Sequence, residues 1–110
     1  MAFKFTSHVP SVNSKVDAAF ARAAEIIGGM AESYAKGLAP VDTGNLRNSI
    51  THESEDDGHT VVVGTNVKYA PYQELGAPNA HVPAHPYIRP AFENHMSEYK
   101  NVVQSELAKI

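Results

Sequence analysis

Apolar residues recur every three or four positions along two long stretches of the chain, and this period predicts two amphipathic helices. The first helix is expected to begin at Ser11 or Ser14, either of which can cap it, and to end at Gly37. Its apolar stripe consists of Val12, Val16, Phe20, Ala23, Ile27, Met30 and Tyr34. The second helix is expected to begin at Pro90, a residue suited to the first helical position. Its stripe consists of Phe92, Met96, Tyr99, Val103, Leu107 and Ile110.

Before the first helix and between the two helices the pattern is that of strands. Residues 3–7 alternate and predict a short strand, and residues 50–55 and 59–66 flank Asp56-Asp57-Gly58, which predicts a hairpin because Asp-Gly is a favoured turn pair. A short helix is expected after Pro40, and one helical turn over residues 69–76. Residues 77–86 contain three prolines and predict an extended loop.

This order predicts an α+β fold in a single domain over residues 1–110. Two long helices pack on a small antiparallel sheet that contains the hairpin, and the Pro-rich loop precedes the C-terminal helix. Gly28-Gly29 lies inside the first helix, where each glycine costs about 1 kcal/mol relative to alanine. A close approach of another backbone, a tolerated kink or a hinge would each explain the pair.

Composition narrows the function classes. The chain has no cysteine, which excludes disulfides and thiolate metal sites and fits assembly in a reducing cytoplasm. A net charge of −3 disfavours a nucleic-acid-binding module. No stretch has the apolar length of a signal peptide or of a membrane span.

The histidines raise one enzymatic alternative. His81 and His85 have the four-residue spacing of zinc ligands on a helix, and with His95 they could serve a metal-dependent hydrolase. Pro83 breaks that spacing, and no glutamate lies between the two histidines to act as the general base. Solvated loop histidines are the simpler interpretation. We therefore predict no enzyme, no metal site and no cofactor.

Residues 69–87 are rich in aromatic residues and proline and poor in charge. Such a loop is typical of an interface between subunits, because prolines lower the entropy lost on docking. A loop that wraps its own domain would have the same composition.

Three strings occur in a fixed order along the chain. The first is Ala-Pro-Val-Asp-Thr-Gly-Asn-Leu-Arg-Asn-Ser-Ile at residues 39–50, and the second combines Val63-Gly64, Tyr69-Ala70 and Glu74-Leu75-Gly76. The third is Pro-Ala-His-Pro-Tyr-Ile-Arg-Pro-Ala at residues 83–91. The order resembles the tail-completion (head–tail joining, neck or minor tail) family of long-tailed siphophages. Tyr87-Ile88 and residues 77–80 depart mildly from the family pattern.

The resemblance implies a structural, non-enzymatic protein of the virion neck that assembles in the host cytoplasm. It implies a homo-oligomeric, hexameric ring between the head connector or adaptor protein and the tail terminator or tube protein, through which DNA passes without specific binding and without contact with a membrane. The interface residues that it implies are Asp42, Gly44, Leu46, Arg47, Tyr69, Tyr72, Glu74, Gly76, Pro86, Tyr87, Arg89 and Pro90. A minor tail protein acting only at the tube end is the alternative.

Charge adds two hypotheses to this assignment. The acidic hairpin tip, formed by Glu53, Glu55, Asp56 and Asp57, would line the DNA channel and keep the duplex centred by repulsion. A tip that only confers solubility is the alternative. Glu74 or Arg89 would form an ion pair between subunits.

Overall fold

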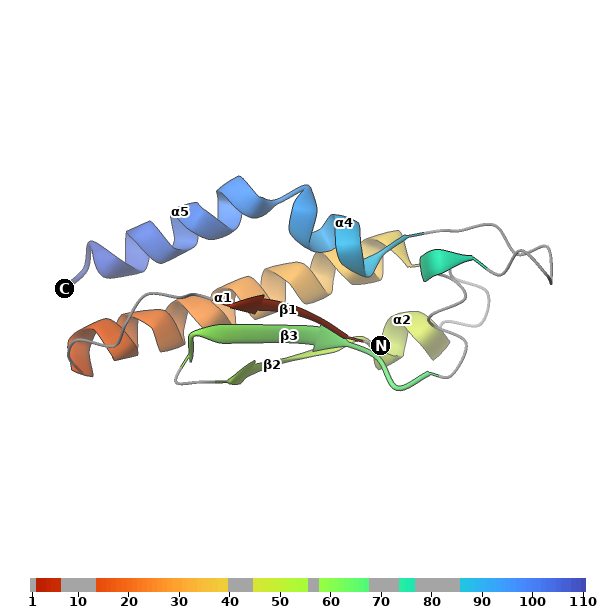
Figure 1. Ribbon diagram of the computed structural model, residues 1–110, viewed down its shortest axis with the longest axis horizontal. Coiled ribbons are helices and arrows are strands. Elements are labelled where there is room, and N and C mark those ends of the chain that lie inside the picture. The colour runs from red at the N-terminus through yellow and green to blue at the C-terminus, as the bar shows by residue number, and fades with distance from the viewer. Residues whose placement is uncertain (1, 7–13, 40–44, 56–57, 68–73, 77–85) are drawn as a thin grey trace.

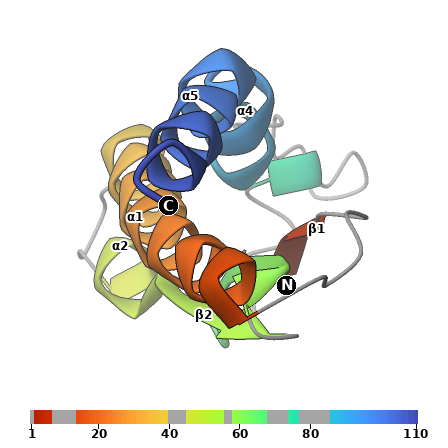
Figure 2. The ribbon, with the colours of Figure 1, turned by 90° about the vertical axis from the view of Figure 1, so that its left-hand side faces the viewer.

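Helix α1 (Ser14–Leu38) forms the middle layer of the molecule, as Figure 1 and Figure 2 show. The computed structural model describes residues 2–6, 14–39, 45–55, 58–67, 74–76 and 86–110. A sheet packs on one side of α1, and helices α4 (Ile88–Glu93) and α5 (Met96–Leu107) pack on another. The molecule is elongated, with extents of 51 × 21 × 20 Å. The predicted α+β fold is confirmed.

The sheet has three antiparallel strands in the order β1-β3-β2. Strands β2 (Thr51–Glu55) and β3 (Thr60–Gly64) form the predicted hairpin, and β1 (Ala2–Thr6) pairs with the free side of β3. The strand expected at residues 3–7 therefore begins one residue earlier. Helix α2 (Asn45–Ser49) confirms the short helix expected after Pro40.

Alanines allow α1 to be covered from two sides. Ala19, Ala23, Ala24, Ala31 and Ala35 are all at most 2% exposed, and only Ala23 belonged to the predicted stripe. Small side chains let neighbouring elements approach the helix closely. Phe20 and Ile27 are buried as predicted. The core then continues into Ile50, Val61 and Val63 of the sheet region and into Tyr87, Ile88, Phe92 and Tyr99 of the C-terminal part.

Two glycines are explained by close approach. Gly58 has φ +88°, and a Cβ there would lie 2.5 Å from the backbone of Ala21, so the hairpin turn rests directly on α1. A Cβ at Gly28 would lie 2.3 Å from the imidazole Cδ2 of His52. The close neighbour of Gly28 is therefore a side chain, where a backbone was expected, and α1 runs continuously through both glycines.

The prediction of a single long C-terminal helix beginning at Pro90 is wrong. Helix α4 begins at Ile88, so Pro90 is its third residue, and Asn94 and His95 separate α4 from α5. The interruption allows His95 to stack on Tyr34 of α1, with ring centroids 3.6 Å apart. Ile110 lies beyond the end of α5 and is 57% exposed, so it does not extend the buried stripe. None of the helices in the described ranges is long and apolar enough to cross a membrane.

Candidate functional site

Glu74 is a buried carboxylate that joins two distant parts of the chain. Its side chain accepts hydrogen bonds from the backbone N–H of Ile88 at 2.8 Å and of Tyr87 at 3.2 Å, and the residue is 4% exposed. These N–H groups lie at the start of α4, where backbone donors lack intrahelical partners. The negative charge also faces the positive end of the helix. We call this arrangement the Glu74 clasp.

The clasp brings together two of the strings that carry the family resemblance. Glu74 and Leu75 are helical, and Gly76 ends the turn with φ +81°, a conformation that favours glycine. The described end of the turn predicted for residues 69–76 is thus confirmed. The partner segment begins at Pro86, which is exposed, and continues into Tyr87 and Ile88, which are at most 1% exposed. Sequence spacing could not reveal this pairing, because 13 or 14 residues separate the partners.

Predicted interface residues fall into two groups. Leu46, Glu74 and Tyr87 are buried within their own chain, whereas Arg47 and Arg89 are exposed. Arg89 lies 3.9 Å from Glu93 on the same helix, and Pro90 is partly buried. The Glu74 carboxylate accepts hydrogen bonds from backbone donors of its own chain, and an ion pair between subunits at Glu74 or Arg89 stays a prediction. Asp42, Gly44, Tyr69, Tyr72, His81 and His85 lie outside the described residues.

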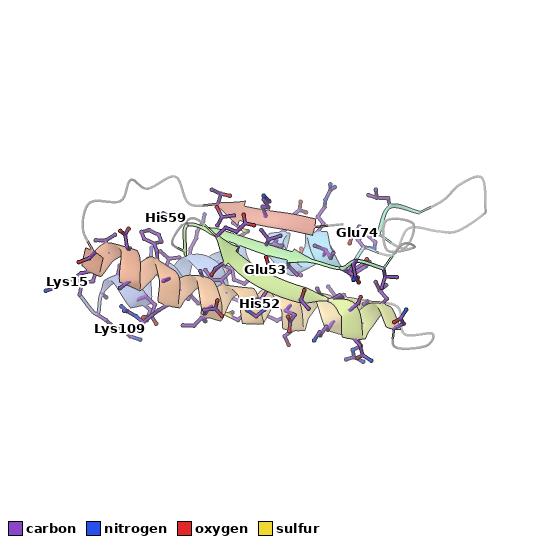
Figure 3. The ribbon with its side chains drawn as sticks, turned by 90° about the horizontal axis from the view of Figure 1, so that it is seen from below. Lys15, His52, Glu53, His59, Glu74 and Lys109 are labelled. Carbon is purple, nitrogen blue, oxygen red and sulfur yellow. The ribbon has the colours of Figure 1, made fainter. Side chains whose placement is uncertain are left out.

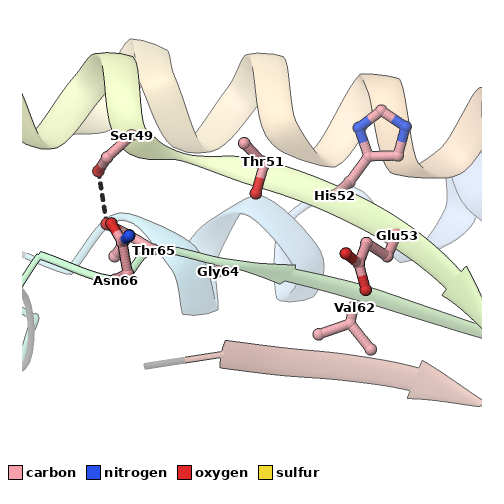
Figure 4. Close-up of a pocket in the computed structure, with 8 residues that line it drawn as sticks. All are labelled: Ser49, Thr51, His52, Glu53, Val62, Gly64, Thr65 and Asn66. Atoms are coloured by element: carbon pink, nitrogen blue, oxygen red, sulfur yellow. Dashed lines mark hydrogen bonds between the residues drawn. The ribbon is translucent and has the colours of Figure 1, made fainter.

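The outer face of the sheet points away from the core cluster that contains Val61 and Val63. Strand alternation directs Val61 and Val63 inward and places Lys4, Glu53, Glu55 and Val62 on the outer face. A hollow of about 420 Å³ lies at one end of this face (Figure 4). Ser49, Thr51, His52, Glu53, Val62, Gly64, Thr65 and Asn66 line it.

Charges on this face are sparse and mainly acidic. Lys4 Nζ lies 3.7 Å from Glu55 Oε2, and both side chains are exposed, so this ion pair contributes little stability. Within the described ranges, Glu53 makes no ion pair. Asp56 and Asp57, the other two residues of the predicted acidic tip, lie outside the described residues.

The sequence patterns missed the histidine–carboxylate pairs that connect the layers. His52 of β2 lies over α1, with Nδ1 3.1 Å from Glu32 Oε1 and Nε2 3.6 Å from Glu25 Oε2 (Figure 3). Burial raises the pKa of Glu32, but hydrogen bonds from His52 and Lys36 outweigh burial and hold the pKa below its usual value. His95 also pairs with Glu98, but this contact is local to the start of α5. Glu98 connects α5 to α1 by accepting a 2.7 Å hydrogen bond from Tyr34.

Two carboxylates of α5 that contact α1 also have lowered pKa values. The hydrogen bond from the Tyr34 hydroxyl lowers the pKa of Glu98, and the hydrogen bond with His95 adds a smaller effect. The bond between Tyr34 and Glu98 also raises the pKa of Tyr34. Hydrogen bonds from Lys109 and Arg22 hold the pKa of Glu106 below its usual value. Among the residues that the structure describes, no three His, Cys, Asp or Glu side chains gather so that they could hold a metal ion.

The fold and the clasp define a small α+β protein in which a three-stranded sheet packs on α1. The chain belongs to the bacteriophage family described as "Bacteriophage HK97-gp10, putative tail-component", whose family model matches residues 1–76. The match covers α1, the whole sheet and Glu74, and it confirms the resemblance to tail proteins of siphophages. Neither the comparison with curated proteins nor that with solved structures gave a match.

Proposed function

We propose that this chain is the tail-completion protein of a long-tailed phage. It is a structural, non-enzymatic protein that forms a ring between the head connector and the tail tube and lets DNA pass. Membership of a phage tail-component family is the observation that carries the proposal. The Glu74 clasp supports it, because the clasp attaches the string beyond the matched range to a string within it.

The exposed members of the predicted interface would contact neighbouring subunits or the connector. The exposed members are Arg47 in α2, Pro86 just before α4, and Arg89 in α4. Buried residues hold both helices in position. Leu46 fixes α2 and Tyr87 fixes the start of α4, so they would act on an interface through the segments they anchor. Gly76 ends the turn that carries Glu74, and Pro90 is the third residue of α4.

Glu53 and Glu55 are the described residues proposed to line the DNA channel. Both extend from the outer face of the sheet, where repulsion of phosphates would let the duplex slide. A map of the virion neck tests this assignment. Density for the hairpin on the inner wall of the ring would support it, whereas density on the outer wall would contradict it.

Negative-stain imaging of lysate from the parent phage with this gene disabled tests the function. Packaged heads beside free tails of normal length are expected, because both parts would be complete but not joined. Complementation with the intact gene should restore joined particles. Tails of abnormal length would favour a role at the tube end only. Intact infectious particles without the gene would refute both roles.

A further inference from the structure

We propose that the two free edges of the sheet pair with each other between copies of this chain. Strand β2 of one copy would add β1 of the next, so that the sheet continues from subunit to subunit. The inference rests on the proposed ring and names the contact that builds it.

Both outer strands have an unpaired edge within the described part of the chain. Of the three described strands, only β3 is paired on both sides. The three strands are equally long and aligned end to end, because Ala2 and Thr51 both pair with Gly64, and Thr6 and Glu55 both pair with Thr60. Edge strands expose N–H and C=O groups that are ready to pair with another strand. A second copy would therefore meet a matching edge over all five residues of the strand.

The two edges have complementary charges on the same face. Lys4 and Glu53 both lie opposite Val62, so they stand at the same level of the sheet and on its outer face. Glu53 makes no ion pair within the described ranges, and the contact of Lys4 with Glu55 at 3.7 Å is loose and exposed. An incoming β1 beside β2 would place Lys4 next to Glu53, where opposite charges stabilise a cross-strand pair.

The strand directions suit a ring. Since β1 and β2 are both antiparallel to β3, they run parallel to each other. In a ring whose strands run along its axis, rotation from copy to copy keeps the strand direction, so β1 and β2 of neighbouring copies would pair in parallel. This contact joins different surfaces of the two copies, and such a contact closes into a ring when the rotation allows it. The outer faces, with Glu53 and Glu55, would then form one continuous surface.

Helix α1 offers a support for the incoming strand. It packs against β2 and β3, whereas β1 is packed against α4. Viewed from below the sheet, α1 runs along the side of β2, away from β1 (Figure 3). Glu25 and Glu32 mark this flank of α1 because both approach His52. Gly29 lies one helical turn from each of them, so it belongs to the same flank.

Gly29 has no explanation within the described part of its own chain. A Cβ at this position would meet nothing within 4 Å, although glycine in a helix interior costs about 1 kcal/mol relative to alanine. An added strand resting on this flank would come close to the α1 backbone at Gly29. A Cβ at Gly29 would then obstruct the added strand, which explains why glycine stands at this position.

Cysteine cross-linking in assembled particles tests the strand pairing. The chain has no cysteine, so each copy of the Lys4→Cys/Glu53→Cys variant in complemented phage particles carries only these two thiols. Within one chain the two residues are two strand spacings apart, roughly 9.5 Å, beyond the roughly 7 Å limit for a disulfide. Between paired copies they are neighbours. We expect a ladder of covalent oligomers on a non-reducing gel, and the ladder should disappear with reductant.

Matched variants control for accidental oxidation. Lys4→Cys/Ser54→Cys should give no ladder, because Ser54 is the next residue of β2 and approaches Glu25 of α1 from the inner face. Dimers formed by Lys4→Cys alone would show β1 paired with β1 and overturn the proposal. Joined particles without a ladder from the Lys4→Cys/Glu53→Cys variant would overturn it as well.

Charge reversal keeps the proposal testable if the cysteine variants fail to assemble. Lys4→Glu and Glu53→Lys should each lower the yield of joined particles about tenfold, and the double exchange should restore it to within about twofold. Thermal unfolding of the purified variants should stay close to wild type, because both side chains are exposed. Failure of the exchange to restore assembly would overturn the pairing. Loss of joining in the disabled-gene phage together with failure of the strand-pairing tests would indicate a ring built by other contacts. Normal joining in the disabled-gene phage would instead refute the joining role itself.

Discussion

Glu74 shows how one side chain can decide the position of a segment. Its carboxylate satisfies buried backbone donors at Tyr87 and Ile88, for which the start of α4 offers no side-chain cap of its own. We expect Glu74→Ala to lower the free energy of unfolding by about 2–3 kcal/mol, because it leaves these donors unsatisfied. Urea denaturation measures the loss. Arg89→Ala, at an exposed position on the same helix, should change stability by less than about 0.5 kcal/mol. Equal stability of both variants would contradict the clasp.

Two glycines give opposite expectations for the same substitution. Gly58→Ala should destabilise the chain by more than about 2 kcal/mol, because φ is +88° and the new Cβ would clash with the α1 backbone. Gly29→Ala should stabilise the isolated chain by about 0.5–1 kcal/mol, because its position is open and helical. Calorimetric unfolding distinguishes the two. A destabilised Gly29→Ala variant would show that this part of α1 is not as open as described.

A side-chain hydrogen bond joins α4 to α5 across the break between them. The Tyr99 hydroxyl of α5 donates to the Ala91 carbonyl of α4, and Tyr99 is fully buried. Tyr99→Phe removes the donor and should cost about 1 kcal/mol. Relative to wild type, amide hydrogen exchange in this variant should speed up more in α5 than in the α2–β2 region. Uniformly faster exchange along the chain would contradict a local role for this bond.

Three carboxylates connect the layers of the whole molecule. Glu32 of α1 bonds with His52 of β2, Glu98 of α5 accepts from Tyr34 of α1, and Glu106 of α5 accepts from Arg22 of α1. The pKa of each is lowered from the ordinary 4.5. A carboxyl with a lowered folded-state pKa contributes stability above its unfolded-state pKa, and this stability is lost as pH falls through the folded-state value.

The stability that these three carboxyls contribute should therefore be fully present above about pH 5 and fall progressively below pH 4.5. Melting temperatures measured between pH 7 and pH 3 test this. Glu106→Gln should melt lower than wild type at pH 7 and lose less on acidification, since its carboxyl no longer takes up a proton. Glu93→Gln, at an exposed position, is the matched control. An acid-induced fall as large in Glu106→Gln as in wild type would contradict this contribution.

The sequence was sufficient for features that depend on neighbours a few residues apart. The three-to-four-residue period located α1, the Asp-Gly pair located the hairpin between β2 and β3, and the ordered strings indicated the family that the comparison confirmed. These signals are local, because helix faces, strand faces and turn dihedrals are set by adjacent residues.

Features that join distant residues needed the folded chain. Gly28 lies against the imidazole of His52, which leaves no room for a larger side chain. At the interruption before α5, His95 stacks on Tyr34. Glu74 accepts hydrogen bonds from backbone donors at the start of α4. The alanines of α1 became informative only once layers on two sides were seen to cover them. In each case the partner lies far along the chain, and packing in three dimensions, rather than sequence spacing, determines which groups meet.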